Sequence, residues 1–416
     1  MFPKSSLKRT LSFVALAFFS SLIVGGASAQ APKSVRIGVL LPISGNLARY
    51  AAETQPTFKY MIDKINAEGG IKSMGGAKIE LVIADDASTT AGAAAEARRL
   101  ILNERVSLIT GPMTTVEALA VAPVVEQLKV PALSYTGGES KSSYLFSTGF
   151  LYDRSHAHTL VSMISALASK DKGHPIKRVA LLYSNYEAGQ QIANFMEPLL
   201  KAKGFEVVGR VAVDRNAQDQ SSAILRLRSL KPDVASGLLL AREGALLHQA
   251  RYNLNYHETI FVGTAAGFDG QTLWTELGPH VAEAVLPRNL FAMSGYNEDL
   301  DIPAATKLLK ELQANVPAKD PPGYYQVLAA QNARVIQRAL EAAGSSQPQA
   351  IRDAMAKVVI PFGDPNLYMP KEGGIAFGPD NMLTDGSGVM LQWEPGGKRR
   401  TVWPPKFATT EARPFR

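Results

Sequence analysis

Residues 35–42 read Val-Arg-Ile-Gly-Val-Leu-Leu-Pro, a nearly continuous apolar run that is ended by a proline. Such a run, without polar alternation, predicts a strand buried on both faces, as in a parallel sheet covered by helices. From Phe58 to Ile65 the apolar residues then recur at spacings of three and four, and Gly69-Gly70 stops the pattern. This spacing predicts an amphipathic helix, so the chain opens with a strand followed by a helix.

The same alternation repeats along the chain. Further strands are expected at residues 79–83, 108–110, 131–134, 178–183, 206–213, 234–240 and 259–263, with helices between them. This order predicts βαβ units and therefore an α/β fold with two parallel-sheet units in tandem. After these come an expected strand at 284–287, helices at 302–313, 323–343 and 348–357, and β-like stretches at 374–377 and 388–393. Periodicity leaves open which unit the late helices complete.

The composition excludes several classes of protein. A chain of 416 residues exceeds the roughly 250 to 300 residues at which a single core stops growing, so at least two packed units are expected. With 46% hydrophobic and 19% charged residues, the chain can bury sizeable cores. The absence of cysteine excludes a disulfide framework, Cys-ligated zinc, iron–sulfur clusters, a thiol nucleophile and a thiol-linked lipid anchor.

The first 29 residues have the pattern of a secretory signal peptide. Basic residues at 4, 8 and 9 precede an apolar run at 11–24 and the triplet Ala27-Ser28-Ala29, which predicts cleavage after Ala29. The alternative is a membrane anchor or a buried first helix, but the run is shorter than the roughly 20 residues that span a bilayer. Cleavage would reduce the net charge from +7 to +4, which is too small an excess to indicate nucleic-acid binding. We therefore expect a soluble periplasmic protein.

The loops after the predicted strands are the expected place for a ligand. They are rich in Gly, Ser, Thr and Tyr, which suits a small polar solute, although Ser and Thr there also act as ordinary helix caps. No nucleophile elbow, phosphate loop, dinucleotide fingerprint or zinc-helix motif occurs, so we expect neither catalysis nor a cofactor. Asp85-Asp86 and the stretch 155–158 are the only candidates for metal or acid–base chemistry, and both lack further ligands.

Several stretches together resemble a known family. They lie behind the signal peptide in the order and spacing of that family, at residues 37–45, 65–71, 85–88, 97–100, 109–112, 130–134 and 178–183. The chain resembles the periplasmic solute-binding proteins of ATP-driven importers, in the branch that includes the leucine/isoleucine/valine-binding proteins. The likeness covers most of residues 34 to 395.

The resemblance implies a type I periplasmic binding fold, in which two Rossmann-like lobes are joined by a three-stranded hinge. Lobe one would comprise residues 34–150 plus 283–360, and lobe two residues 151–282 plus 361–416. A ligand in the cleft would stabilise a closed form. The partners implied are an inner-membrane ABC permease with its ATPase subunits, so the protein would be a carrier and not an enzyme.

The resemblance also implies site residues. In amino-acid-binding relatives the ligand carboxylate is held at positions that fall here on Thr114, Thr115, Thr136 and Gly138, with an aromatic residue at Tyr50. Gly138 departs from the pattern, because relatives place a hydroxyl there. An acidic residue that pairs with the ligand ammonium aligns near Ala265, so that counter-charge is missing.

The missing acid and the presence of Arg242 favour a carboxylate without an α-ammonium, since a guanidinium prefers a carboxylate and an unpaired buried ammonium is costly. We therefore expect an aromatic acid, held by Arg242 or Arg154 and by Thr115 and Thr136. The expected apolar or stacking walls are Tyr50, Tyr135, Tyr152 and Phe268.

Three alternatives stay open at this point. Arg242 could be a solvated surface residue, and Tyr135 and Phe268 could serve core or hinge packing. The solute could instead be an aliphatic amino acid, an amide or urea. The chain could also be a periplasmic sensor that presents its ligand to a receptor, or an exported hydrolase, which the lack of a nucleophile and base disfavours.

Overall fold

The computed structural model describes residues 34–138, 140–170, 175–270, 272–287, 289–317 and 322–414. The predicted signal peptide lies outside these residues. The strand predicted from residues 35–42 is β1 (Ser34–Leu41), which lies inside a five-stranded sheet of order β2-β1-β3-β4-β5. All its pairings are parallel, and β1 aligns with β2 from Ser34 opposite Lys78 to Leu41 opposite Asp85. The other strands are β2 (Lys78–Asp85), β3 (Leu108–Thr110), β4 (Ala132–Ser134) and β5 (Leu145–Ser147).

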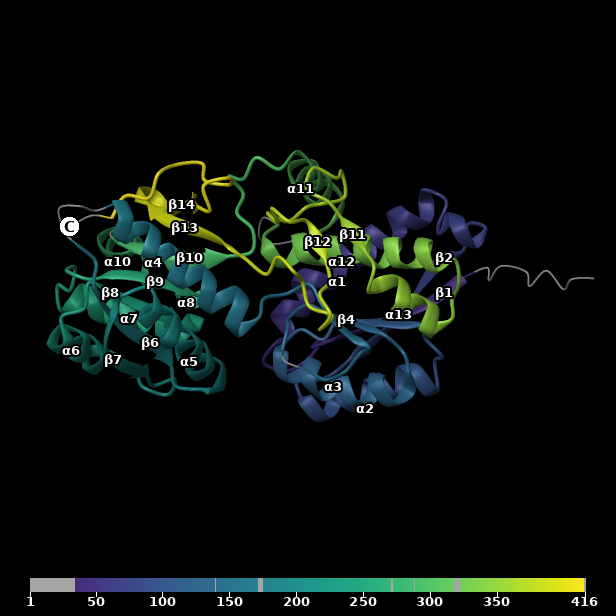
Figure 1. Ribbon diagram of the computed structural model, residues 1–416, viewed down its shortest axis with the longest axis horizontal. Helices are drawn as coiled ribbons and strands as arrows, with labels where there is room; N and C mark the ends of the chain where they lie inside the picture. The colour runs from purple at the N-terminus through teal and green to yellow at the C-terminus, as the bar shows by residue number, and fades with distance from the viewer. Residues whose placement is uncertain are drawn as a thin grey trace, which may run out of the picture. The chain divides into compact units, whose positions relative to one another are not determined.

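Helices from both ends of the sequence cover this first sheet. The early ones are α1 (Ala48–Ala67), η1 (Lys72–Met74), α2 (Thr90–Leu102) and α3 (Thr115–Leu128). The late ones are α11 (Pro303–Asn315), α12 (Tyr324–Ala343) and α13 (Pro348–Met355), and a small pair of strands, β11 (Val359–Ile360) and β12 (Ile375–Ala376), follows. Figure 1 shows α12 beside α1, and Val327 and Ile336 of α12 share one buried core with Ile37 and Phe58. The late helices therefore complete the first unit.

The second sheet has seven strands, in the order β14-β13-β10-β9-β8-β6-β7. The strands β6 to β10 are parallel, whereas β13 and β14, drawn in yellow in Figure 1, add an antiparallel edge beside β10. The sheet is thus mixed and not wholly parallel. Its strands are β6 (Arg178–Ser184), β7 (Glu206–Val213), β8 (Val234–Leu238), β9 (Ile260–Thr264), β10 (Leu290–Ser294), β13 (Val389–Glu394) and β14 (Lys398–Trp403).

Both faces of the second sheet are buried. Neighbouring residues of each strand enter two different cores. Leu182 of one strand and Phe261 of another lie in the first core, and the adjacent Leu181 and Val262 lie in the second. This explains why these strands read as unbroken apolar runs. The accompanying helices are α4 (His158–Lys170), α5 (Glu187–Ala202), α6 (Ser221–Leu230), α7 (Ala241–Asn253), α8 (Ala266–Asp269), α9 (Leu273–Leu277) and α10 (Pro279–Val285), with the π-helical turn η2 (Tyr152–Ala157) and the short 3-10 turn η3 (Pro395–Gly397).

The predicted α/β class, with two helix-flanked sheets, is confirmed, but one predicted strand is wrong. Residues 284–287, expected to form a strand, lie at the end of α10 and just beyond it. Pro279 occupies the first turn of this helix, and Ala282 and Val285, three residues apart, are buried. The true strand is β10, whose five residues are all buried.

The sheets also place the lobe boundaries differently from the sequence prediction. Lobe one was expected to resume at residue 283, yet β10 pairs with β9 in the second sheet. Lobe two was expected to resume at residue 361, yet Tyr368 and Ile375 lie in the core that contains α1 and α12. The chain accordingly passes between the two sheet units three times, at about residues 148–157, 295–302 and 383–388. These three segments are the hinge connections of the fold.

Candidate functional site

The loop after β3 and the loop after β4 meet at the N-terminus of α3. The Thr114 hydroxyl accepts the Glu117 N–H at 3.4 Å, and the Glu117 carboxylate accepts the Thr114 N–H at 3.1 Å, which forms a capping box. Thr115 is 8% exposed and its hydroxyl donates to the Gly137 carbonyl at 2.9 Å. Thr114 therefore caps the helix, while Thr115 fastens the two loops together.

Thr136 and Gly138 lie in the loop that Thr115 holds. The Thr136 hydroxyl oxygen is buried and has no hydrogen-bond partner within the described residues. A buried hydroxyl without a partner is costly, so it is a natural contact for a ligand atom. A Cβ at Gly138 would lie 2.6 Å from the Thr115 Cγ2. The hydroxyl-bearing residue that relatives place there would collide with Thr115, which explains the glycine.

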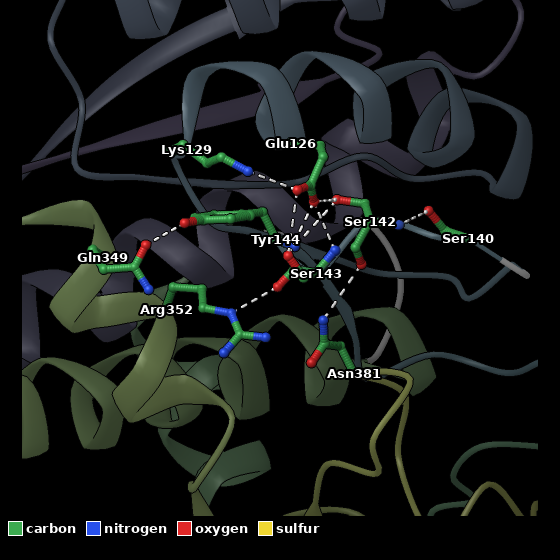
Figure 2. A network of polar contacts seen from close by, with 9 residues as sticks. All are labelled: Glu126, Lys129, Ser140, Ser142, Ser143, Tyr144, Gln349, Arg352 and Asn381. Atoms are coloured by element: carbon green, nitrogen blue, oxygen red, sulfur yellow. Dashed lines mark hydrogen bonds and ion pairs between the residues drawn. The ribbon is translucent and has the colours of Figure 1, made fainter.

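A polar network holds the far end of the same loop (Figure 2). The Glu126 carboxylate on α3 accepts from the Ser143 N–H at 2.7 Å, from the Ser142 hydroxyl at 3.1 Å and from Lys129 at 2.8 Å. The Lys129 hydrogen bond is the largest of the causes that lower the pKa of Glu126 to about 2. From α13, Arg352 donates to the Ser143 carbonyl at 2.8 Å. The loop that carries Thr136 and Gly138 is thus fixed to two helices.

Two tyrosines lie beside this region. Tyr152, the first residue of η2, lies within hydrogen-bonding reach of Thr115, and burial raises its pKa. Tyr186, just before α5, lies within electrostatic reach of both Tyr152 and Tyr50, and burial likewise raises its pKa. The Arg215 guanidinium lies 5.0 Å from the centroid of the Tyr186 ring. Tyr186 was not among the predicted site residues, although it lies in one of the expected ligand loops.

A polar pocket of about 550 Å³ opens where β6, β7 and β8 end. The residues that line it are Asn185, Asp214, Arg215, Asn216, Leu240, Ala241, Arg242 and Glu243. Arg242 is exposed, and its two terminal nitrogens donate to the Arg215 carbonyl at 2.9 Å and to the Gln218 side chain at 3.0 Å. Its guanidinium is therefore held in place, and it forms no ion pair with any described residue.

Arg154, the other arginine expected to hold a carboxylate, already has an acidic partner. Its guanidinium pairs with Asp380, whose second oxygen accepts the Met382 N–H at 3.2 Å. Met382 forms a parallel bridge with Ser147 of β5. Arg154 thus links η2 to the segment beside the first sheet, and of the two candidates Arg242 is the one whose charge is not already paired.

Tyr135 and Phe268 lie in the cores rather than on a surface. Tyr135 is 2% exposed within the core around α1, and Phe268 is fully buried in a core of the second sheet. The Phe268 ring fills the space where a Cβ at Gly263 would lie, 2.2 Å from its ring carbon. Of the two interpretations left open for these residues, this placement favours packing.

Tyr50 belongs to a group of three tyrosines around an acid that sequence reasoning missed. Its ring meets Tyr325 edge-on with centroids 5.0 Å apart, and Tyr325 meets Tyr324 at 5.2 Å. The Asp269 carboxylate lies within electrostatic reach of all three hydroxyls. Burial raises the pKa of Asp269, although the charge of Arg399, which donates to the Asp269 carbonyl at 2.6 Å, acts in the opposite direction.

The position where relatives carry an acid is strained. Ala265 has φ 66° and ψ 178°, a conformation that residues other than glycine seldom adopt. Ala265 directly follows β9 and precedes the short helix α8, which ends at Asp269. Asp269 therefore lies four positions after Ala265, at the end of this short helix.

The candidate metal clusters are explained by local bonding. The Asp85 carboxylate accepts the N–H groups of Ile43, Ser44 and Ala87 at 2.8 to 3.1 Å. His156 has its Nδ1 3.0 Å from the Thr264 hydroxyl, and burial lowers its pKa to about 4. Among the described residues no group of three or more His, Asp or Glu side chains could hold a metal ion. Nor does any helix in this part of the chain have the length and apolarity required to cross a bilayer.

Comparison with known proteins points to one family. A family model described as periplasmic binding protein matches residues 34–398. The Leu/Ile/Val-binding protein homolog 7 of Brucella abortus is 27% identical over 403 residues, which cover 95% of this chain and 97% of that protein.

Two solved structures share the fold. The isoleucine complex of the branched-chain amino acid substrate-binding protein of Streptococcus pneumoniae superposes with a TM-score of 0.70 at 21% identity, covering 89% of this chain and 100% of the other. A solute-binding protein of R. palustris in complex with benzoate superposes with a TM-score of 0.69 at 18% identity. This superposition covers 92% of this chain and 98% of the other. The family match, which spans most of the chain, and the two-sheet architecture lead to one conclusion: the chain belongs to the periplasmic binding protein family.

Proposed function

We propose that this protein is the periplasmic solute-binding component of an ABC importer. It captures a small carboxylate, an aromatic acid, between its two lobes and delivers it to an inner-membrane permease that works with ATPase subunits. The signal peptide at residues 1–29 directs it to the periplasm. The single observation that carries the ligand class is the pocket in which the fixed Arg242 guanidinium has no acidic partner.

Groups at the end of the first sheet complement this arginine. The Thr136 hydroxyl is buried without a partner, and Thr115 lies beside it at the start of α3, where the first-turn N–H groups favour an anion. Tyr152 and Tyr186 supply aromatic surface between Thr115 and the pocket. The benzoate complex of the R. palustris protein supports an aromatic acid as a ligand that this fold can hold.

An aliphatic amino acid is the second candidate, and Asp269 is the observation that favours it. A carboxylate beside Tyr50, Tyr324 and Tyr325 could pair with an ammonium. The names of the Brucella relatives point the same way. Against it, burial raises the pKa of Asp269, which disfavours its charged form, and the Arg399 charge already lies within electrostatic reach of this carboxylate, so we favour the solute without an ammonium.

A thermal-shift experiment on residues 30–416 tests this proposal. Benzoate and 4-hydroxybenzoate should raise the melting temperature and L-leucine should not, because a ligand that binds only the folded state stabilises it. The Arg242→Gln variant should lose this shift, whereas Arg226→Gln, an exposed arginine on α6 without an ion pair among the described residues, should keep it. A shift with leucine and none with the aromatic acids would refute the ligand class.

A further inference from the structure

The pocket at the end of the second sheet contains two guanidinium groups without acidic partners. Arg242 uses one N–H of each terminal nitrogen for the Arg215 carbonyl and the Gln218 side chain, so three of its five N–H donors stay unused. The Arg215 guanidinium lies over the Tyr186 ring and forms no hydrogen bond or ion pair with any described side chain or carbonyl. One carboxylate does not need this many donors.

The acids of the pocket do not neutralise these arginines. The Glu243 carboxylate is 3% exposed and accepts from the Ser184 hydroxyl and the Leu240 N–H, so it points into the protein. Asp214 is exposed and accepts the Asn216 N–H at 2.9 Å. Neither acid forms an ion pair with Arg215 or Arg242 in the described structure. The accessible part of the pocket therefore favours an anion.

This pocket is separate from the anion contact at Thr115. Tyr152 lies within hydrogen-bonding reach of Thr115, Tyr186 lies within electrostatic reach of Tyr152, and the Arg215 guanidinium lies 5.0 Å from the centroid of the Tyr186 ring. Two aromatic side chains thus lie between the two polar ends. A solute that reaches from Thr115 to the arginines has to pass along these rings, which suits an apolar middle.

We propose that the solute is a dicarboxylate with an apolar middle, one carboxylate binding at Thr115 and Thr136 and the other between Arg215 and Arg242. This inference rests on the proposed function and narrows it from one carboxylate to two. It also assigns to Arg215 a role that the sequence did not indicate. Arg215 determines specificity by favouring a second anionic group over a neutral one.

Calorimetric titration of residues 30–416 with matched solutes tests the inference. Benzene-1,4-dicarboxylate and its monomethyl ester have nearly the same shape and differ by one charge. The diacid should bind about tenfold or more tightly, because a charge-assisted hydrogen bond is about twice as strong as a neutral one. Azelate, adipate and succinate form a second series, in which we expect the affinity to fall as the chain becomes too short to join both ends.

The Arg215→Gln variant sharpens the test. The ratio of the two dissociation constants, ester to diacid, should fall towards one in this variant and stay at its wild-type value in Arg226→Gln. An equal affinity for diacid and monoester in the wild type, or an unchanged ratio in Arg215→Gln, overturns the inference while leaving the proposed function intact. Binding of leucine with no binding of benzoate or of any dicarboxylate overturns the proposed function itself, and no binding of any tested solute contradicts both.

Discussion

At the scale of single residues, the site depends on close contacts that composition does not reveal. Gly138 is the clearest case, because the Thr115 methyl group occupies the space that a side chain at 138 would need. Thr115 is β-branched and therefore has few alternative rotamers, and its hydroxyl is already bound to the Gly137 carbonyl. The two residues should behave as one unit.

A double-mutant cycle tests that coupling. Gly138→Ala should lower the free energy of unfolding by about 1 to 3 kcal/mol, because it overpacks the contact with Thr115. Thr115→Ser removes the methyl group and keeps the hydroxyl, so the double variant should recover most of that loss. Urea unfolding of the four proteins measures the coupling, and strictly additive effects would show that the two side chains do not compete.

Glu126 predicts a pH-dependent contribution to stability. Its pKa is about 2 in the folded protein, below its ordinary value of 4.5, so its contribution is complete above about pH 4.5 and is lost as the pH falls towards 2. Glu126→Gln should cost about 1 kcal/mol at pH 7, a value reduced for solvent screening because the side chain is 36% exposed.

The difference in free energy of unfolding between wild type and Glu126→Gln should shrink as the pH falls from 4.5 to 2. Chemical unfolding at several pH values measures it. Glu80→Gln, an exposed position on β2, serves as the control and should show no such trend. A difference that stays constant down to the acid limit would contradict the assigned role of the carboxylate.

The site residues stay a prediction at this scale. Thr115 and Thr136 were named from the family resemblance and Arg242 from the preference of a guanidinium for a carboxylate. Arg154 could not be separated from Arg242, because its partner Asp380 is 226 residues away in the chain. Asp269 was not named, because it lies four positions after Ala265 at the end of a short helix that the sequence pattern did not predict.

At the scale of elements, the three hinge connections meet around one buried lysine. Lys371 is 1% exposed, donates to the Ser387 carbonyl at 2.5 Å and lies 5.2 Å from the centre of the Phe150 ring. Phe150 in turn stacks on Tyr324, whose ring packs against Gly295. Residues of the first, second and third connections are thus joined through adjacent contacts.

Lys371 predicts a second pH effect on stability. Here burial disfavours the charged form, whereas at Glu126 the neighbouring donors favour it. Burial lowers the pKa of Lys371 to about 8, so between pH 8 and 10.5 the unfolded state binds more protons, and folding stability should rise with pH in that window. Relative to Lys371→Met, the free energy of unfolding of the wild type should rise by on the order of 2 to 3 kcal/mol between pH 8 and 10.5. The exposed Lys203→Met variant is the control. If wild type and Lys371→Met differ in free energy of unfolding by the same amount at pH 7 and pH 10, the lowered pKa of Lys371 is contradicted.

Element prediction succeeded where periodicity was strong and failed where it was weak. Strand β1 and helix α12 were placed nearly to the residue, because each has a long and regular pattern. The strand predicted at 284–287 was misplaced, since Ala284 and Val285 fit a strand locally, whereas Ala282 and Val285, three residues apart, are the buried positions of a helix. Sheet membership of β10 follows from a long-range pairing that no local pattern encodes.

At the scale of the whole molecule, the proposed solute contacts both lobes. Thr115 and Thr136 belong to the first sheet unit, and Arg215 and Arg242 belong to the second. A solute that contacts both should favour the closed form over the open one. Removing contacts on either side should therefore weaken binding.

Thr115→Val provides the matching change on the first lobe. It preserves the shape of the side chain and removes the hydroxyl that bonds to Gly137 and lies beside Tyr152. We expect the affinity for benzoate to fall about tenfold, because the loss of one hydrogen bond releases the loop that carries Thr136 from the start of α3. An unchanged dissociation constant in calorimetry would remove Thr115 from the site.

The most direct test of the central claim is a calorimetric comparison of benzoate and L-leucine binding to residues 30–416. We expect saturable binding of benzoate at one site per chain and no heat of binding for leucine, because the Arg242 guanidinium favours a carboxylate and burial disfavours the charged form of Asp269 that an ammonium would need. Tight binding of leucine with none of benzoate would contradict this claim.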